Sequence, residues 1–219
     1  MIRNNLKKII RKLLVLYTWM KYHRKFELGK NVVISKLKCV GHFTKQSVKI
    51  GDNSNLYNCS IVFNSMNLNR LIIGTNCNLH NAEFILRNGG GNLIELGSCC
   101  TTGGNVQFAA CEGRSIRIGN DCQFAHNISC WTTDHHPIFD LQRNRVNVAK
   151  DVILGNHIWI GTGSLVLKGS VIRDGNIIGA HSVVSGKCLE TNCIYAGVPA
   201  QLLKKNVVWE RRFQGVHEV

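Results

Sequence analysis

Aliphatic residues recur every six positions in the C-terminal half of this chain. Counted from Leu154, hexads begin at positions 154, 160, 166, 172, 178, 184, 190 and 196, and six of these eight positions hold Leu, Ile or Val. Gly is frequent at the second position of the hexad, and the fifth position is small, as at Ser164, Ser170 and Ser182. A helix repeats its apolar face every 3.6 residues and a strand every two, so neither alone produces this period.

A period of six is typical of a solenoid in which each hexad is one short strand and one corner. The aliphatic residue points inward and stacks on its counterpart in the next coil. The fifth residue must be small because it shares the narrow interior near the corner. Three hexads then make a triangular coil of about 18 residues, with neighbouring coils separated by the ~4.8 Å of a β-ladder.

The first half of the chain carries a looser form of the same pattern. An aliphatic residue followed by Gly returns at intervals of 23, 23 and 22 residues, and a small residue follows three positions after each Gly. These intervals predict coils of about 18 residues with a few extra residues at one corner, as at 88–91. The pairs are Ile50-Gly51, Ile73-Gly74, Leu96-Gly97 and Ile118-Gly119, and the small residues are Ser54, Cys77, Cys100 and Cys122.

The chain has ten cysteines, which we interpret as free thiols and not as disulfides. Several of them occupy the small position of the repeat, where a thiol acts as a small buried hydrophobe. The basic N-terminus lacks the small-residue cleavage site of a secretory signal, so a reducing compartment is expected. No pair of CxxC motifs is present, and we expect no metal site.

Two segments lie outside the repeats. Residues 1–30 hold nine Lys and Arg and one acid, which accounts for +8 of the net charge of +14. Within residues 1–25, apolar side chains have helical spacing, which predicts a basic amphipathic helix. The second segment, residues 130–150, interrupts the solenoid as one protruding loop, and such interruptions commonly carry function. The expected domains are the helix (1–30), the β-solenoid (31–203) and a C-terminal tail (204–219).

Two roles for the N-terminal helix are open from the sequence alone. It caps the open end of the solenoid, or it lies on an anionic membrane surface through residues 1–25. No apolar run approaches the ~20 residues needed to cross a bilayer, so we expect a cytoplasmic protein that is at most peripheral at the inner face of the plasma membrane. The positive charge is not interleaved with aromatic residues, and we expect no nucleic-acid partner.

The loop contains the sequence from Trp131 to Ile138, which includes His135-His136-Pro137. A histidine can take the proton of a hydroxyl near neutral pH and so make the oxygen nucleophilic. Asp134 or a backbone carbonyl would hold the imidazole in the required tautomer. A solvated histidine pair is the alternative interpretation of this segment alone.

Downstream, residues 155–161 (GNHIWIG) open the regular coils. They place Trp159 where neighbouring hexads carry smaller residues. A Trp that does not fit the interior must face outward, and we expect it to cover something there.

Taken together, the hexads, the T-x-x-H-P loop, the G-N-x-x-W-I-G segment and the sequence AGVPA at 196–200 resemble the hexapeptide-repeat acyltransferases. The resemblance covers residues 48–209 and is greatest to bacterial surface-polysaccharide O-acetyltransferases, in particular those that act on sialic-acid capsules. It implies a left-handed parallel β-helix, a homotrimer, and transfer of acetyl from acetyl-CoA to a sugar hydroxyl of a capsule or O-antigen.

The same resemblance assigns roles to individual residues. His136, directly before Pro137, matches the family's general base, with His135 as the alternative, and Trp159 matches a Trp of the catalytic site. Gln201 stands where relatives carry a basic residue near the nucleotide phosphates, and Lys204 would serve instead. The acetyl-CoA positions are Gly161, Thr162, Gly179, Ala180, Ser185, Gly186 and Lys204, and the acceptor-lining positions are Asn105, Asn127, Trp131, Asp134 and His135.

Three other functions compete with polysaccharide acetylation. A related enzyme would acetylate a small molecule such as an antibiotic, a simple sugar or serine. A metal-binding solenoid similar to the γ-carbonic anhydrases would need three converging histidines, and His126, His157 and His181 lack the expected close pair. An inactive scaffold is the third.

Overall fold

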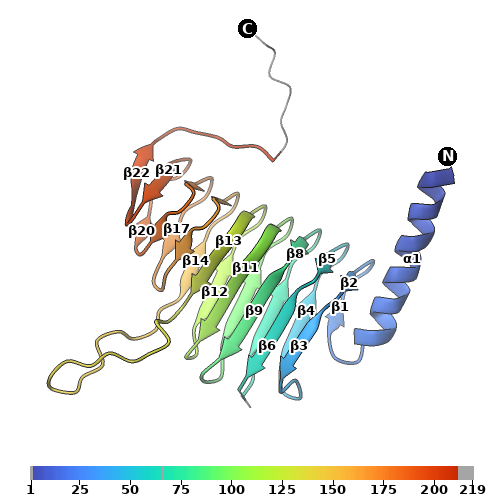
Figure 1. Ribbon diagram of the computed structural model, residues 1–219, viewed down its shortest axis with the longest axis horizontal. Coiled ribbons are helices and arrows are strands. Elements are labelled where there is room, and N and C mark those ends of the chain that lie inside the picture. Colours follow the sequence, from blue (N-terminus) through green and yellow to red (C-terminus); the bar gives the residue numbers. More distant parts are fainter. Residues whose placement is uncertain (1, 66, 212–219) are drawn as a thin grey trace, which may run out of the picture.

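The structure, a computed structural model, describes residues 2–65 and 67–211 of the 219-residue chain. One helix, α1 (Ile2–Tyr22), is followed by a parallel β-solenoid, as Figure 1 shows. The coils wind left-handed, which confirms the predicted fold class. Within the described residues no helix is both long and apolar enough to cross a membrane.

The solenoid is a three-sided prism. Face A is an eight-stranded parallel sheet, and faces B and C together form the fourteen-stranded sheet, which bends at the corner between them. Face A contains β1 (Glu27–Leu28), β4 (Ser47–Ile50), β7 (Arg70–Ile73), β10 (Leu93–Leu96), β12 (Ser115–Ile118), β14 (Val152–Leu154), β17 (Val171–Ile172) and β20 (Lys187–Cys188).

Strands β11 (Thr101–Cys111) and β13 (Gln123–Trp131) run around the corner and belong to both remaining faces. Face B also contains β2 (Val33–Ser35), β5 (Asn55–Tyr57), β8 (Asn78–His80), β15 (Trp159–Ile160), β18 (Ile177–Ile178) and β21 (Ile194–Gly197), and β22 (Ala200–Lys204) pairs antiparallel with β21. Face C also contains β3 (Lys38–Gly41), β6 (Ser60–Asn64), β9 (Ala82–Arg87), β16 (Leu165–Val166) and β19 (Val183–Val184).

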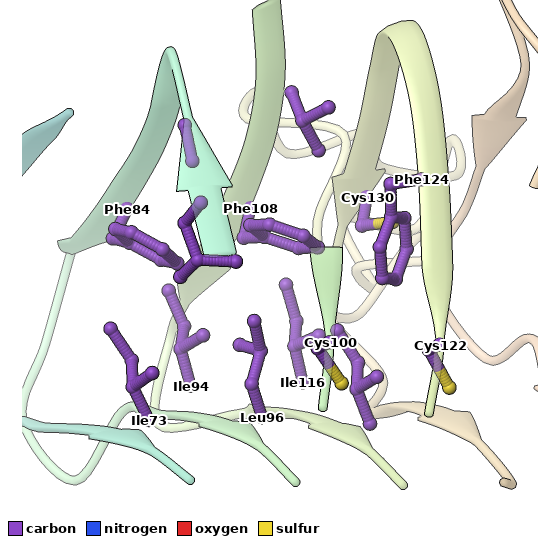
Figure 2. Close-up of a cluster of buried hydrophobic side chains, with 14 of the residues drawn as sticks. Ile73, Phe84, Ile94, Leu96, Cys100, Phe108, Ile116, Cys122, Phe124 and Cys130 are labelled. Carbon is purple, nitrogen blue, oxygen red and sulfur yellow. The ribbon is translucent and has the colours of Figure 1, made fainter. Parts of the chain in front are cut away.

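The pairing register confirms the repeat predicted for the first half. Ile50 pairs with Ile73, Ile73 with Leu96, and Leu96 with Ile118, so residues 22 or 23 positions apart are neighbours in successive coils. All four side chains are buried. Figure 2 shows face A aliphatics and face C phenylalanines turned toward one another across the interior. Phe84 stacks on Phe108 there, with ring centroids 5.6 Å apart.

The small residues of the repeat form a buried column at the corner between faces A and B. Each donates a hydrogen bond from its side chain to the carbonyl of a Gly in the next coil. The donors are Ser54, Cys77, Cys100 and Cys122, at 2.8, 3.2, 3.3 and 3.3 Å respectively. All ten cysteines are free and eight are buried, as predicted. Burial raises the pKa of the Cys130 thiol to about 12.

The last coil departs from the predicted hexads at positions 190 and 196. Glu190 is exposed, and Tyr195, not Ala196, is the buried residue that pairs with Ile178. The physical reason is corner length. Val184 and Cys188 are four residues apart, whereas the equivalent pair in the preceding coil, at 166 and 172, is six apart. The shorter corner moves the inward position from 190 to 188. The next interval, from Cys188 to Tyr195, is seven residues where the preceding coil has six, so the following inward position is 195.

The predicted N-terminal helix is confirmed over Ile2–Tyr22, and β1 already lies in face A, so solenoid structure begins before residue 31. Helix α1 packs on the first coil mainly through its C-terminal part. Thr18 is fully buried, accepts a hydrogen bond from the Ile34 amide at 2.9 Å and donates one to the Ile34 carbonyl at 3.4 Å. Tyr22 is also buried.

Candidate active site

The predicted loop leaves the solenoid at the corner between faces C and A. It runs from the end of β13 at Trp131 to the start of β14 at Val152, and an isolated antiparallel bridge joins Phe139 to Arg145. Figure 1 shows it projecting from the side of the prism. Elsewhere this corner is only a few residues long, so the loop is an insertion at one edge and leaves the stacking of coils intact.

One side chain braces the backbone around His136. Asn147 is 8% exposed, and its amide oxygen accepts a hydrogen bond from the Ile138 N–H at 2.6 Å. Its amide nitrogen donates to the His136 carbonyl at 2.8 Å and to Asp134 Oδ2 at 2.9 Å. Asn147 therefore holds the loop on both sides of the His-Pro step.

Lys168, at the same corner of the next coil, ties this brace to the solenoid. Its ammonium pairs with Asp134 and donates to the Asn147 carbonyl at 2.9 Å. Although partial burial opposes ionisation, the hydrogen bonds from Lys168 and Asn147 lower the pKa of Asp134. Asp134 thus stays charged at neutral pH and anchors the loop, and among the described residues no hydrogen bond joins its carboxylate to either imidazole ring.

Glu112, at the equivalent corner of the preceding coil, provides a second anchor. Its carboxylate accepts two hydrogen bonds from Arg145, at 2.6 and 3.0 Å, and one from Thr133 at 2.7 Å. Hydrogen bonds from Arg145 and Thr133 lower the pKa of Glu112. Both arms of the loop are therefore tied to one carboxylate.

We expect the substitution Asn147→Ala to raise hydrogen–deuterium exchange across residues 133–148 by roughly tenfold or more. It removes three short hydrogen bonds, each worth about 1 kcal/mol, and a longer one from Arg145 Nε at 3.5 Å. The matched control is Asn144→Ala, because Asn144 is exposed and its side chain bonds only Asp140 within the loop. Unchanged exchange in Asn147→Ala would show that the loop does not depend on this brace.

The two histidines of the loop have different surroundings. His135 is half-buried, packs edge-on against Trp131 with centroids 5.4 Å apart, and its Nδ1 lies 3.1 Å from Nη2 of Arg87. Burial, with the neighbouring Arg87 charge, lowers the pKa of His135. Arg can only donate, so Nδ1 accepts and the neutral ring carries its proton on Nε2. His135 then has no free lone pair for a hydroxyl proton. His136 is exposed.

Trp159 lies on face B and points outward, as predicted, with 38% of its surface exposed. It borders a cleft of about 410 Å³ whose other walls come from the two preceding coils and from Arg211. The lining includes Thr101, Gly103, Gln123, His126 and Arg211. A hydroxyl, an amide, an imidazole and an indole there suit a polar, ring-shaped ligand.

Residues 206–211, within the predicted C-terminal tail, return along face B as a strap that the sequence did not indicate. Trp209 is buried, stacks on His157 at 4.3 Å, and lies 6.0 Å from the Trp159 ring. The Trp209 indole donates to the His157 carbonyl at 3.0 Å. Arg211 pairs with Asp121 at 2.6 Å and donates to two backbone carbonyls. The strap packs beside Trp159 and so limits its movement.

His157 belongs to this strap contact. Its Nδ1 lies 2.7 Å from Asp121 and its Nε2 lies 3.0 Å from the Trp209 carbonyl, so both nitrogens already have partners. Among the residues that the structure describes, no group of three or more His, Cys, Asp and Glu side chains is placed to hold a metal ion.

Four of the predicted acetyl-CoA positions lie at the corner between faces B and C. A Cβ on Gly161 would lie 2.6 Å from the Ala180 amide nitrogen, and one on Gly179 would lie 2.7 Å from the Ala196 Cβ. Glycine is therefore required there by coil stacking, whatever else these positions do. Thr162 and Ala180 are partly or fully accessible at the same corner.

Asn105 and Asn127 lie at that corner too. Both have positive φ, 52° and 56°, which Asn tolerates better than most residues, and the Asn105 amide donates to the Asn127 amide oxygen at 2.8 Å. Their corner conformation accounts for the residue type, and a role in lining the acceptor site stays a prediction.

Ser185 and Gly186 lie at the other edge, the corner between faces C and A, where they line a cavity of about 380 Å³. A Cβ on Gly186 would meet nothing within 4 Å, so coil stacking does not require glycine there. Gln201 also lines this cavity, and Lys204 is exposed at the end of β22.

The candidate residues are thus divided between two edges of the prism, one on each side of face C. The loop residues Trp131 to His136, with Ser185 and Gly186, occupy the C/A edge. Trp159 projects from face B, near the B/C edge that carries Asn105, Asn127 and the Gly161–Thr162 and Gly179–Ala180 pairs. No contact within the described residues joins Trp159 to the His136 loop.

Comparison with known proteins identifies the family. No protein-family model matches the chain. A polysialic acid O-acetyltransferase of Neisseria meningitidis is 37% identical over 173 residues, 76% of this chain and 80% of that protein. One of Escherichia coli O1:K1 is 33% identical over 98 residues, 44% of this chain and 32% of that protein.

Comparison with solved structures points to the same family. The polysialic acid O-acetyltransferase OatWY is 33% identical with a TM-score of 0.51, over 88% of this chain and 93% of that one. The polySia-specific acetyltransferase NeuO, 23% identical, shares the fold with a TM-score of 0.57 over 88% of this chain and 85% of that one. The chain therefore belongs to the polysialic acid O-acetyltransferase group of the hexapeptide-repeat acetyltransferases.

Proposed function

We propose that this enzyme transfers the acetyl group of acetyl-CoA to a hydroxyl of an acidic capsular polysaccharide of the polysialic acid type. The observation that carries the proposal is the 37% identity to a polysialic acid O-acetyltransferase over 80% of that protein. Two further observations support it, namely the braced histidine loop at one edge of the solenoid and the Trp159 cleft near the next edge.

His136 is the proposed general base. Its ring takes the proton of the acceptor hydroxyl as the oxygen attacks the thioester carbonyl. The C–S bond then breaks, the acetyl ester forms, and the imidazolium returns the proton to the sulfur of CoA, so no proton is gained or lost. The brace through Asn147 and the occupied Nδ1 of His135 both support this assignment.

Acetyl-CoA would lie along the C/A edge, where the cavity at Ser185 and Gly186 fits its thin pantetheine arm. The open space beside Gly186 supports this fit. Relatives carry a basic residue near the nucleotide phosphates at the position of Gln201. Lys204 would contact a phosphate in its place. Lys205 is paired with Glu190 at 2.6 Å, which favours Lys204 for that role.

A homotrimer would complete the site. The loop lies at the C/A edge of the prism, whereas Trp159 and the Gly161–Thr162 segment lie toward the B/C edge. Around a threefold axis parallel to the solenoid, the C/A edge of one copy would meet the B/C edge of the next. His136 of one chain and Trp159 of its neighbour would then face a shared groove.

The acceptor is expected to be a polyanion because cations surround the loop. Arg114, Arg143 and Lys150 are exposed there, and residues 31–219 carry a net charge of +6 in addition to the +8 of the N-terminal segment. A cationic surface attracts an extended acidic polymer, and salt weakens this attraction.

Acetyl-CoA consumption should distinguish the acceptor classes. We expect kcat/KM for polysialic acid to exceed that for chloramphenicol or a galactoside by at least about 100-fold, with a KM for the polymer that rises with ionic strength. The small acceptors are chosen because galactoside and chloramphenicol acetyltransferases are 28% identical to part of this chain. Preference for either small acceptor would refute the polysaccharide assignment.

A further inference from the structure

The apolar stripe of helix α1 faces away from the solenoid. Positions 11, 15, 18 and 22 lie on one side of the helix and contact the first coil. Arg11 donates to Asn55 at 3.2 Å, and Thr18 and Tyr22 are buried. The stripe lies on the opposite side, at positions three and four apart, and consists of Leu6, Ile9, Ile10, Leu13, Tyr17 and Met20. Leu16 and Trp19 lie between the two sides and line a cavity of about 600 Å³ against the first coil.

These six side chains are 47–66% exposed, and Trp19 beside them is 55% exposed. A contiguous apolar surface of this extent on one helix marks an interaction site. The helix does contact the end of the solenoid, yet it does so through Arg11, Val15, Thr18 and Tyr22. Capping therefore does not account for the stripe, and the stripe needs another partner.

The charge of the helix identifies the chemistry of that partner. Residues 1–26 contain eight Lys and Arg and no Asp or Glu. Lys12 and Lys21 lie on the two flanks of the stripe, and both are exposed. Packing two copies of this helix stripe to stripe would gather like charges with no acid to compensate them. Anionic lipid headgroups compensate such charges while the acyl chains take up the apolar side chains.

We propose that helix α1 docks the enzyme on an anionic lipid bilayer through this stripe. Leu13 and its neighbours enter the boundary between headgroups and acyl chains, and the flanking lysines contact the lipid phosphates. Trp19 and Tyr17 are amphipathic and suit the same depth. Because Thr18 holds the helix to Ile34, docking places the N-terminal end of the solenoid toward the membrane. This inference does not depend on the identity of the acetyl acceptor.

Co-sedimentation of the full-length protein with vesicles tests the proposal. We expect binding to vesicles of phosphatidylglycerol and phosphatidylcholine, with at least about tenfold weaker binding to phosphatidylcholine alone. Leu13→Glu should lower the partition coefficient by about tenfold, and Met20→Gln should lower it by a similar factor without adding a negative charge. Lys12→Gln should lower binding to the anionic vesicles only.

The matched control is Leu68→Glu, which changes an equally exposed leucine at a solenoid corner, far along the chain from α1. It should bind vesicles as the wild type does. Circular dichroism and sedimentation velocity of each variant report folding and assembly. Wild-type binding by both Leu13→Glu and Met20→Gln would overturn the proposal. So would a smaller assembly in these variants, because the stripe would then be an interface between copies.

Discussion

Replacing His136 by alanine should lower kcat for acetyl transfer by about 10²–10⁴-fold, which is the range for loss of a general base. The apparent affinity for acetyl-CoA should stay within about twofold of wild type, because the cavity at Ser185 and Gly186 is formed by other coils. Steady-state kinetics with a polysialic acid acceptor, and binding of CoA by calorimetry, measure the two quantities separately.

His135→Ala is the control within the same loop. His135 supports the loop by packing on Trp131 and accepting from Arg87, and its proton lies on Nε2. We expect kcat of His135→Ala to fall by less than about tenfold, because the substitution only loosens the packing of the loop. If His135→Ala lost as much activity as His136→Ala, and hydrogen exchange showed the loop intact, the base would be His135 and the present assignment would be wrong.

The second prediction with a large effect is that activity is recovered when two impaired variants are coexpressed. Trp159→Ala should lower activity by about 10²-fold, because the indole forms one wall of the cleft. If each site combines His136 of one chain with Trp159 of the next, coexpressed His136→Ala and Trp159→Ala chains form some intact sites. Random assembly in a cyclic trimer leaves about one quarter of the sites with both residues.

The double variant His136→Ala/Trp159→Ala supplies the control. Coexpressed with an equal amount of wild type, it should leave about one quarter of the sites active if sites are shared, and about one half if each chain carries its own complete site. Recovery below a few per cent in the two-variant mixture, with mixed trimers shown by mass spectrometry, would contradict the shared site.

The solenoid was predictable from the sequence because its code is local. Each inward position needs an aliphatic residue and each corner needs a small one, so the pattern appears in the chain at fixed intervals, as at Ile50, Ile73 and Leu96. The prediction was wrong in the last coil, where Tyr195 is buried instead of Ala196. The corner between β19 and β20 consists of only two residues, Ser185 and Gly186. Counting in sixes from Leu154 cannot reveal a shortened corner.

The candidate site was only partly predictable. The His136 loop and Trp159 stood out by their residue types and by motif. The brace and the strap did not, because Asn147 and Lys168 belong to no motif, and the resemblance of residues 206–209 to relatives does not place Trp209 against His157. These residues act across 11 to 52 residues of chain. Their function follows from hydrogen bonds that only the folded chain brings within range.

The sequence by itself determined that the chain coils with a six-residue period, that a loop with two histidines interrupts the coils, and that the N-terminus is a basic amphipathic helix. Period and side-chain polarity depend on residue order alone, so they can be derived without coordinates. Only the tertiary structure decided which way the helix faces, that Nδ1 of His135 accepts a hydrogen bond from Arg87, and which edge of the prism carries each part of the site. These depend on contacts between residues far apart in the chain, such as Thr18 with Ile34, Arg87 with His135, and Trp209 with His157.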